Sequence, residues 1–210
     1  MKYVDTSIKT ANLNITYPVI TRVETSGMGN SIVASGYPMA TDAIDLLPHR
    51  VAGNDVKRAN KLASAPSGSG HDCFLKGIIV QMDVTFSEKA WPEAQRYHWF
   101  DFVSSMSTMH MLPKMSIKYI EYTDPVIINR FEELVAAYNS NPTKEKWLRM
   151  IYSYPSGLLL TARITTNYMQ LKTIYHQRRT HRLPEWQEFC DWVEAFPHSE
   201  FITGKAEECK

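Results

Sequence analysis

Residues 165–182 read Thr-Thr-Asn-Tyr-Met-Gln-Leu-Lys-Thr-Ile-Tyr-His-Gln-Arg-Arg-Thr-His-Arg. The threonine pair and Asn167 are typical of a helix start, because a side-chain oxygen there can accept a hydrogen bond from an unpaired backbone N–H. Three side chains then follow at the spacing of a buried helix face, namely Leu171, Ile174 and Tyr175. The next position in that stripe is Arg178, so we expect its charge to point inward, toward a partner.

Three further basic groups stand directly behind Arg178. With Arg179, His181 and Arg182, the predicted helix ends in four groups that could hold an anion. The alternative is a solvated basic last turn, which the helix dipole favours in any case. That alternative applies more readily to Arg179 and Arg182 than to Arg178, whose phase matches the apolar stripe.

Composition excludes several classes of protein. The chain has 210 residues, 44% of them hydrophobic, and a net charge of +1, so nothing global favours binding to nucleic acid or to an acidic membrane surface. Its three cysteines are widely spaced without a Cys-x-x-Cys pair, so we expect reduced thiols and no zinc site. No run resembles a signal peptide or a membrane span. We therefore expect a cytoplasmic protein.

The pattern of elements predicts an α+β fold, richer in helix than in strand, with a small central antiparallel or mixed sheet. The predicted strands cover residues 13–25, 78–86, 116–122 and 157–166, the last being a strand or an extended lead-in. The predicted helices are 30–34, 42–47, 55–62, 87–103, 125–138, 141–152, 165–182 and 184–196. We interpret residues 1–210 as a single domain, in which 63–70 form a flexible loop and 203–210 a frayed tail.

Two other segments are candidates for chemistry. His71-Asp72 follows a glycine-serine loop and precedes a buried strand, although such a dipeptide is more often simply a surface loop. Five polar side chains at the end of the predicted helix could bind phosphate or sugar hydroxyls: Ser104, Ser105, Ser107, Thr108 and His110. They could equally cap that helix over core methionines. No P-loop, zincin or hydrolase motif occurs.

Set in order, four blocks of the sequence resemble the flavin-dependent thymidylate synthases, the ThyX family. They are Val23–Ala34, His71–Phe74 with the strand after it, Ala90–Ser107, and Leu159–Arg178 with a Thr-x-Asn followed eleven residues later by arginine. As a divergent member of this family, the chain would adopt its fold, assemble as a homotetramer and bind a dUMP- or dTMP-like nucleotide.

The resemblance also assigns roles to individual residues. It implies that Arg178 contacts the pyrimidine nucleotide and stabilises charge that develops on it during catalysis, and that His71 and Asn167 line the site of FAD. Three further residues fall near the phosphate: Ser105, Ser107 and His110. No metal is implied.

One departure from the family divides the functional hypotheses. Where the family signature has Arg-His-Arg, this chain has Phe100-Asp-Phe102 or Asp101-Phe-Val103, and Met169 replaces another arginine. A flavin diphosphate would lose charge-assisted donors there. The first hypothesis is therefore an enzyme of thymidylate synthase type, and the second a non-catalytic protein that sequesters or senses a nucleotide. A third is a pure assembly role, and a bacteriophage or its host is one conceivable source.

Overall fold

An antiparallel sheet forms the centre of the protein. The computed structural model describes residues 18–42 and 50–205. The strands are β1 (Val19–Ser26), β2 (Ile79–Ser87), β3 (Asp101–Ser105) and β4 (Leu159–Asn167), in the order β1-β2-β4-β3. The two central strands, β2 and β4, pair over their full length, from Ile79 opposite Asn167 to Ser87 opposite Leu159. The predicted α+β class with a small central sheet is confirmed.

The two faces of the sheet differ in character. Alternate residues of β2 and β4 are buried and apolar, which is the pattern of a sheet with one face on the core. The opposite face is polar: Asp83 is bound by both Arg22 and Arg163, and Thr85 Oγ1 lies 2.7 Å from Thr161 Oγ1. Only the apolar face is therefore available to the covering helices.

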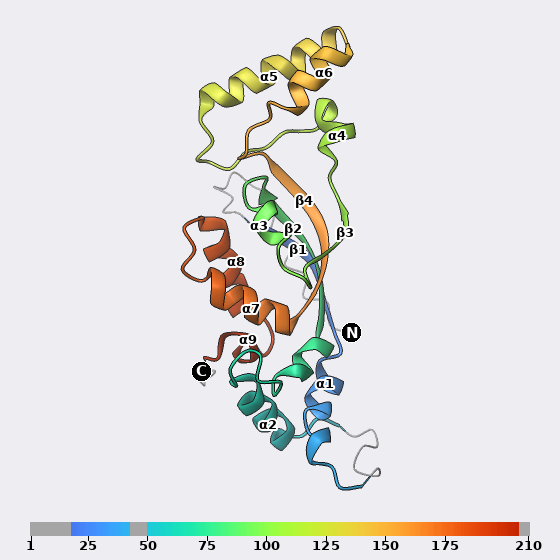
Figure 1. Ribbon diagram of the computed structural model, residues 1–210, viewed down its shortest axis with the longest axis vertical. Coiled ribbons are helices and arrows are strands. Elements are labelled where there is room, and N and C mark those ends of the chain that lie inside the picture. The colour runs from blue at the N-terminus through green and yellow to red at the C-terminus, as the bar shows by residue number, and fades with distance from the viewer. Residues whose placement is uncertain (1–17, 43–49, 206–210) are drawn as a thin grey trace.

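Helices α7 (Tyr168–Arg178) and α8 (Pro184–Glu194) lie on the apolar face, together with the short α3 (Trp91–Ala94) (Figure 1). An aromatic cluster joins them to the sheet: the ring of Phe86 lies 4.9 Å from that of Trp186 and 5.2 Å from that of Trp91, between centroids. Trp186 and Phe189, on the helix predicted at 184–196, are fully buried.

Separate groups of helices occupy the two ends of the sheet (Figure 1). One end has α1 (Met28–Ala34), α2 (Gly53–Ala63), α9 (Glu200–Thr203) and the 3-10 turns η1 (Tyr37–Met39) and η3 (Cys73–Gly77). The other end has α4 (Thr108–Met111), η4 (Leu112–Lys114) and the antiparallel pair α5 (Pro125–Ser140) and α6 (Lys144–Ile151). The sequence predicted α1, α2, α5 and α6 within a few residues.

The helix predicted over residues 87–103 is wrong. Only one turn of it forms, as α3, and residues 101–105 instead pair with β4 as the edge strand β3, with Phe102 opposite Ile164. β4 offers an unpaired edge there, and Phe102 and Val103 are residue types that are enriched in strands. The ring of Phe102 also packs 5.0 Å from Trp91, which fixes the strand to the core.

Two smaller predictions are also corrected. The strand predicted over 116–122 is reduced to one bridge between Tyr119 and Leu158. Thr203 is buried and helical rather than the start of a frayed tail. Three parts of the predictions lie outside the described residues. They are residues 43–47 of the predicted helix at 42–47, residues 13–17 of the predicted strand at 13–25, and residues 206–210 of the predicted tail.

Candidate functional site

Arg178 points inward, as its phase predicted. Leu171, Ile174 and Tyr175 are buried on α7, and the stripe ends on the Arg178 side chain, which is 12% exposed. The helix begins where the sequence indicated, because Asn167 Oδ1 accepts a hydrogen bond from the Gln170 N–H at 2.9 Å. A strand that passes directly into a capped helix therefore sets the position of this arginine.

The partner of Arg178 is a carboxylate from α3. Arg178 Nη1 donates to Glu93 Oε2 at 2.7 Å, and Trp186 Nε1 donates to the same oxygen at 3.1 Å. His181 Nε2 lies 3.2 Å from that oxygen as well. His181 Nδ1 accepts the Leu183 N–H, so Nε2 carries the ring hydrogen and donates to Glu93. Three donors thus converge on one carboxylate oxygen.

Two aromatic rings support the guanidinium. Its central carbon lies 4.8 Å from the Trp186 ring centroid and 5.4 Å from that of Tyr97. Arg178 Nε donates to Tyr97 Oη at 2.7 Å, and Tyr97 Oη donates to Gln177 Oε1 at 3.2 Å. Burial raises the pKa of Tyr97, so it stays a neutral phenol at neutral pH. The positive charge is therefore held in a fixed place against aromatic faces.

The structure separates the four basic groups that the sequence placed together. Arg179 pairs with Asp191 and Glu194 of α8, and Arg182 is exposed. Of the three groups behind Arg178, only His181 shares its carboxylate. We name the cluster of Glu93, Tyr97, Arg178, His181 and Trp186 the Arg178 site.

His71 lies on an exposed loop, one residue before a buried ion pair. Lys172 Nζ of α7 lies 2.7 Å from Asp72 Oδ2 and also donates to the Ala63 and Ala65 carbonyls. Asp72 has no exposed surface, and the Lys172 side chain is 7% exposed. The His-Asp dipeptide therefore contributes a structural anchor through Asp72, while the His71 side chain faces solvent.

Ser105 is the last residue of β3, and Ser107 and His110 follow it at the start of α4. Ser107 caps α4: its Oγ accepts the His110 N–H at 3.3 Å and lies 3.0 Å from His110 Nδ1. Ser105 is exposed opposite Ala162 of β4. Among the described residues, no hydrogen bond or ion pair joins these three to Arg178, His71 or Asn167. The alternative in which the nearby methionines are core is wrong, since Met106, Met109 and Met111 are 42–50% exposed.

Sequence reasoning missed three members of the Arg178 site. Tyr97, Trp186 and Glu93 fall within predicted helices, but none of them was singled out. Glu93 directly follows Pro92 in the short helix α3. Because a long helix was expected over 87–103, the sequence did not indicate that Glu93 would lie beside α7. A carboxylate in an otherwise aromatic segment was the available signal.

The described part of the chain contains no cluster of His, Cys, Asp or Glu able to hold a metal ion. It also contains no helix long and apolar enough to cross a membrane.

No family model and no curated protein matches this sequence. Similarity appears at the level of structure. A crystal structure of flavin-dependent thymidylate synthase ThyX from Helicobacter pylori, complexed with FAD and dUMP, superposes with a TM-score of 0.63 at 13% identity, covering 86% of this chain and 96% of that one. A second structure of Helicobacter pylori ThyX with FAD and dUMP gives 0.66 at 11% identity, covering 89% and 97%. The protein therefore has a fold similar to that of ThyX.

Proposed function

We propose that this protein binds a pyrimidine deoxynucleotide of the dUMP or dTMP type at the Arg178 site, and that it does so without FAD. The observation that carries the proposal is the convergence of Arg178, Trp186 and His181 on one oxygen, because such a set of donors is suited to an anionic or carbonyl oxygen of a ligand. The fold similarity to ThyX chains complexed with dUMP supports the same class of ligand.

In this structure Glu93 Oε2 accepts the hydrogen bonds that an oxygen of the ligand would accept in the complex. A nucleotide phosphate or pyrimidine oxygen would replace Glu93 Oε2 on Arg178, with the base or sugar against the aromatic side chains. Because the guanidinium is already oriented by Tyr97 and Trp186, little side-chain entropy would be lost on binding. In an active enzyme, Arg178 would stabilise negative charge developing on the pyrimidine ring.

The residues present do not fit a flavin dinucleotide. In either register the signature positions fall between Phe100 and Val103, at the start of β3, where Asp101 introduces a negative charge and the apolar side chains offer no donor to a diphosphate. The Asn167 side-chain oxygen caps α7, and Met169 stands where the family has an arginine. This mismatch favours the second hypothesis, a protein that sequesters or senses the nucleotide, over a flavin enzyme.

We also propose that the chain associates with itself through β3 and the segment after it. All five residues of β3 are exposed, and Val103 is 61% exposed on a strand edge with unpaired backbone groups. The exposed methionines 106, 109 and 111 continue this surface. A second copy could cover the edge and bring Ser105, Ser107 and His110 toward another subunit's Arg178 site.

Calorimetric titration with dUMP and dTMP tests the nucleotide proposal. We expect saturable binding to the wild type and none to Arg178→Ala, while Arg179→Ala, which removes the neighbouring arginine, binds as the wild type does. At a nucleotide concentration of about 100 times Kd, binding should add about 2.7 kcal/mol to the unfolding free energy. Equal binding by Arg178→Ala, or none by the wild type, would refute it.

The visible spectrum and a titration with FAD test the second half of the proposal. We expect a colourless protein that gives no heat with FAD. Flavin absorption bands in the purified protein would restore the flavin-enzyme hypothesis.

A further inference from the structure

Gln177, the residue before Arg178 on α7, belongs to the same hydrogen-bonded chain as the Arg178 guanidinium. Arg178 Nε donates to Tyr97 Oη at 2.7 Å, and Tyr97 Oη donates to Gln177 Oε1 at 3.2 Å. Gln177 is exposed, whereas the Arg178 side chain is 12% exposed. An exposed amide therefore ends a chain of bonds that begins at the guanidinium for which we propose nucleotide binding.

The donors and acceptors in this chain can be assigned in only one way. A guanidinium N–H can only donate, so the Tyr97 oxygen accepts from Arg178. Burial raises the pKa of Tyr97, so the phenol keeps its one hydrogen at neutral pH, and that hydrogen is left for Gln177. A side-chain amide accepts only through its oxygen. Gln177 Oε1 therefore faces Tyr97, and the two hydrogens of Nε2 are directed away from it.

The fold holds the Tyr97 side of this chain in place. Tyr97 is buried, and two residues later the Trp99 backbone N–H donates to Gln170 Oε1 at 3.2 Å. The segment 97–99 is therefore bonded to α7 at both ends. Gln170 and Gln177 are seven residues apart, about two turns, so they lie on the same side of the helix. The orientation of the Gln177 amide is thus set before a ligand binds.

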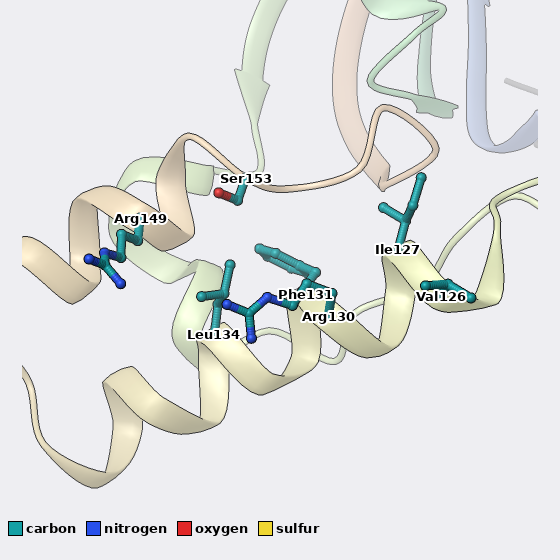
Figure 2. A pocket seen from close by; sticks show the side chains of 7 residues that line it. All are labelled: Val126, Ile127, Arg130, Phe131, Leu134, Arg149 and Ser153. Carbon is teal, nitrogen blue, oxygen red and sulfur yellow. The ribbon is translucent and has the colours of Figure 1, made fainter.

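The hollow between α5 and α6 contains charged groups that are held much more loosely. It has a volume of about 390 Å³, and Figure 2 shows Arg130 and Arg149 beside Phe131 among its lining residues. Both arginine side chains are 66% exposed and pair with exposed glutamates on their own helices. Exposed pairs of this kind fix their side chains only weakly, so their charge alone does not select a class of ligand. Gln177 differs because a buried phenol orients it.

The amino group of Gln177 is available to a ligand. Across residues 18–42 and 50–205, it makes no hydrogen bond to another group of the protein. An amide nitrogen carries two hydrogens and accepts none, so its partner in a complex must be an acceptor such as an oxygen. Because the amide is already oriented, little side-chain entropy would be lost when that oxygen binds.

A pyrimidine base has an edge that such a donor can distinguish. On the edge away from the sugar, uracil and thymine carry an oxygen at C4, which accepts, whereas cytosine carries an amino group there, which donates. Proteins that bind an unstacked base commonly recognise it through this edge. A donor placed there favours uracil and thymine, because the amino group of cytosine would leave two donors facing each other without an acceptor.

We propose that Gln177 selects uracil and thymine over cytosine at the Arg178 site. The C4 oxygen of the base would accept from Gln177 Nε2, while another oxygen of the same nucleotide accepts from the Arg178 guanidinium. This inference rests on the nucleotide binding proposed above and adds the residue that recognises the base.

Calorimetric titration of the full-length protein with dUMP, dTMP and dCMP at pH 7 tests this selectivity. The three nucleotides carry the same sugar and phosphate, so the ratio of the Kd for dCMP to the Kd for dUMP reports on the base alone. In the wild type we expect dCMP to bind about tenfold more weakly than dUMP, and dTMP to bind about as tightly as dUMP.

Two variants of Gln177 should change this ratio in different ways. Gln177→Met is similar in length but removes the donors, so the ratio should fall close to one. Gln177→Glu still offers an oxygen to Tyr97 but accepts at the ligand, so the ratio should invert, since a carboxylate accepts from the cytosine amino group. Its charge weakens the binding of each nucleotide phosphate alike, so only the ratio is compared.

A second exposed glutamine provides the matched control. Gln95 bonds to neither Arg178 nor Tyr97 among the described residues, so Gln95→Met should keep the ratio of the wild type. Because both glutamines are exposed, the thermal unfolding midpoint of every variant should stay within about 2 °C of the wild type.

The outcomes separate this inference from the proposal on which it rests. Equal Kd values for dCMP and dUMP in the wild type would overturn the role of Gln177 and leave nucleotide binding intact. A wild-type ratio that Gln177→Met does not change would also overturn it, because another residue would then distinguish the bases. Binding of none of the three nucleotides would refute both proposals together.

Discussion

Helix α7 and strand β3 carry the two groups of residues in the candidate nucleotide site. The key side chains of α7 are buried and paired within the chain, whereas those of β3 are exposed. α7 is anchored by a buried ion pair at Lys172, and its last residue, Arg178, is neutralised by Glu93. β3 is exposed along its whole length, and the Ser107 and His110 side chains that follow it bond mainly to each other. The polar groups of Arg178 on α7 are paired within the same chain. The side chains and the backbone edge of β3 are instead available to a partner.

This contrast indicates which of the two segments tolerates substitution. Arg178 is held by the same aromatic rings that form the core, so changing it would leave Glu93 and Tyr97 without their partner. In β3 the Phe102 ring packs against Trp91, whereas the Val103 side chain is 61% exposed, so substitution at Val103 costs the fold little. Arg178 therefore has a structural role in addition to the nucleotide-binding role that we propose for it.

The largest expected effect breaks the anchor of α7. Lys172→Met should lower the unfolding free energy by about 3–5 kcal/mol, because it leaves the Asp72 carboxylate buried without its countercharge. Urea denaturation measures this, and Lys61→Met on the exposed surface of α2 is the control, expected within about 0.5 kcal/mol. A loss below about 1 kcal/mol for Lys172→Met would mean that α7 is no better anchored than β3.

Releasing Arg178 from its internal partner should have the next largest effect. Glu93→Gln keeps an oxygen that can accept from Trp186 and His181 but removes the negative charge that competes with a nucleotide. We expect dUMP to bind roughly tenfold more tightly, about 1.4 kcal/mol, in calorimetric titration. Glu133→Gln, an exposed glutamate on α5, should leave binding unchanged. Weaker binding by Glu93→Gln would mean that the carboxylate itself contacts the ligand.

A smaller effect concerns pH and the buried start of α8. Burial raises the pKa of Glu185, so the folded state holds this proton more tightly than the unfolded chain does. Its contribution to stability is full below the unfolded pKa, near 4.5, and declines as pH rises through the folded pKa. Glu185→Gln should remove that decline.

Urea denaturation at a series of pH values measures the effect of Glu185→Gln. The variant should gain stability relative to the wild type as pH rises from about 4.5. Parallel stability curves for the two proteins would show that Glu185 does not titrate differently in the folded state.

The smallest expected effect on stability is at β3. Val103→Lys should change the unfolding free energy of the dilute protein by less than about 0.5 kcal/mol, because the side chain is 61% exposed. It should nevertheless shift the sedimentation profile toward monomer, since a lysine on an edge strand opposes pairing with another copy. Val51→Lys, at another exposed valine, is the control. Unchanged sedimentation of Val103→Lys would argue against association through β3.

Local chemistry made much of the fold predictable. The cap at Asn167, the Asp124-Pro125 start of α5 and the apolar stripe ending at Arg178 each act within a few residues, so the sequence alone indicates them. β3 could not be predicted in this way, because its conformation depends on the free edge of β4, about sixty residues later in the chain. Phe102 and Val103 favour strands, but the run from Tyr97 to Phe100 before them is equally compatible with a buried helix.

The candidate site was predictable only in part, for the same reason. The inward direction of Arg178 followed from helix periodicity, but its partner Glu93 lies 85 residues earlier in the sequence. His71 was singled out, whereas the fold uses its neighbour Asp72. The conformation of the loop decides whether His71 or Asp72 faces the core. A loop has no helical or strand periodicity from which this orientation could be predicted.

The direct junction of β4 and α7 has a consequence for how this chain can change in length. Asn167 is the last residue of the strand, paired with Ile79, and the cap of the helix that follows. Arg178 lies eleven residues beyond it, about three turns, so it returns to within roughly 20° of the same helix face. One inserted or deleted residue between them would turn the guanidinium by about 100° and shift it by about 1.5 Å along the axis. A single-residue insertion or deletion in α7 would therefore separate Arg178 from Glu93, whereas a point substitution elsewhere in the helix leaves the direction of the Arg178 side chain unchanged.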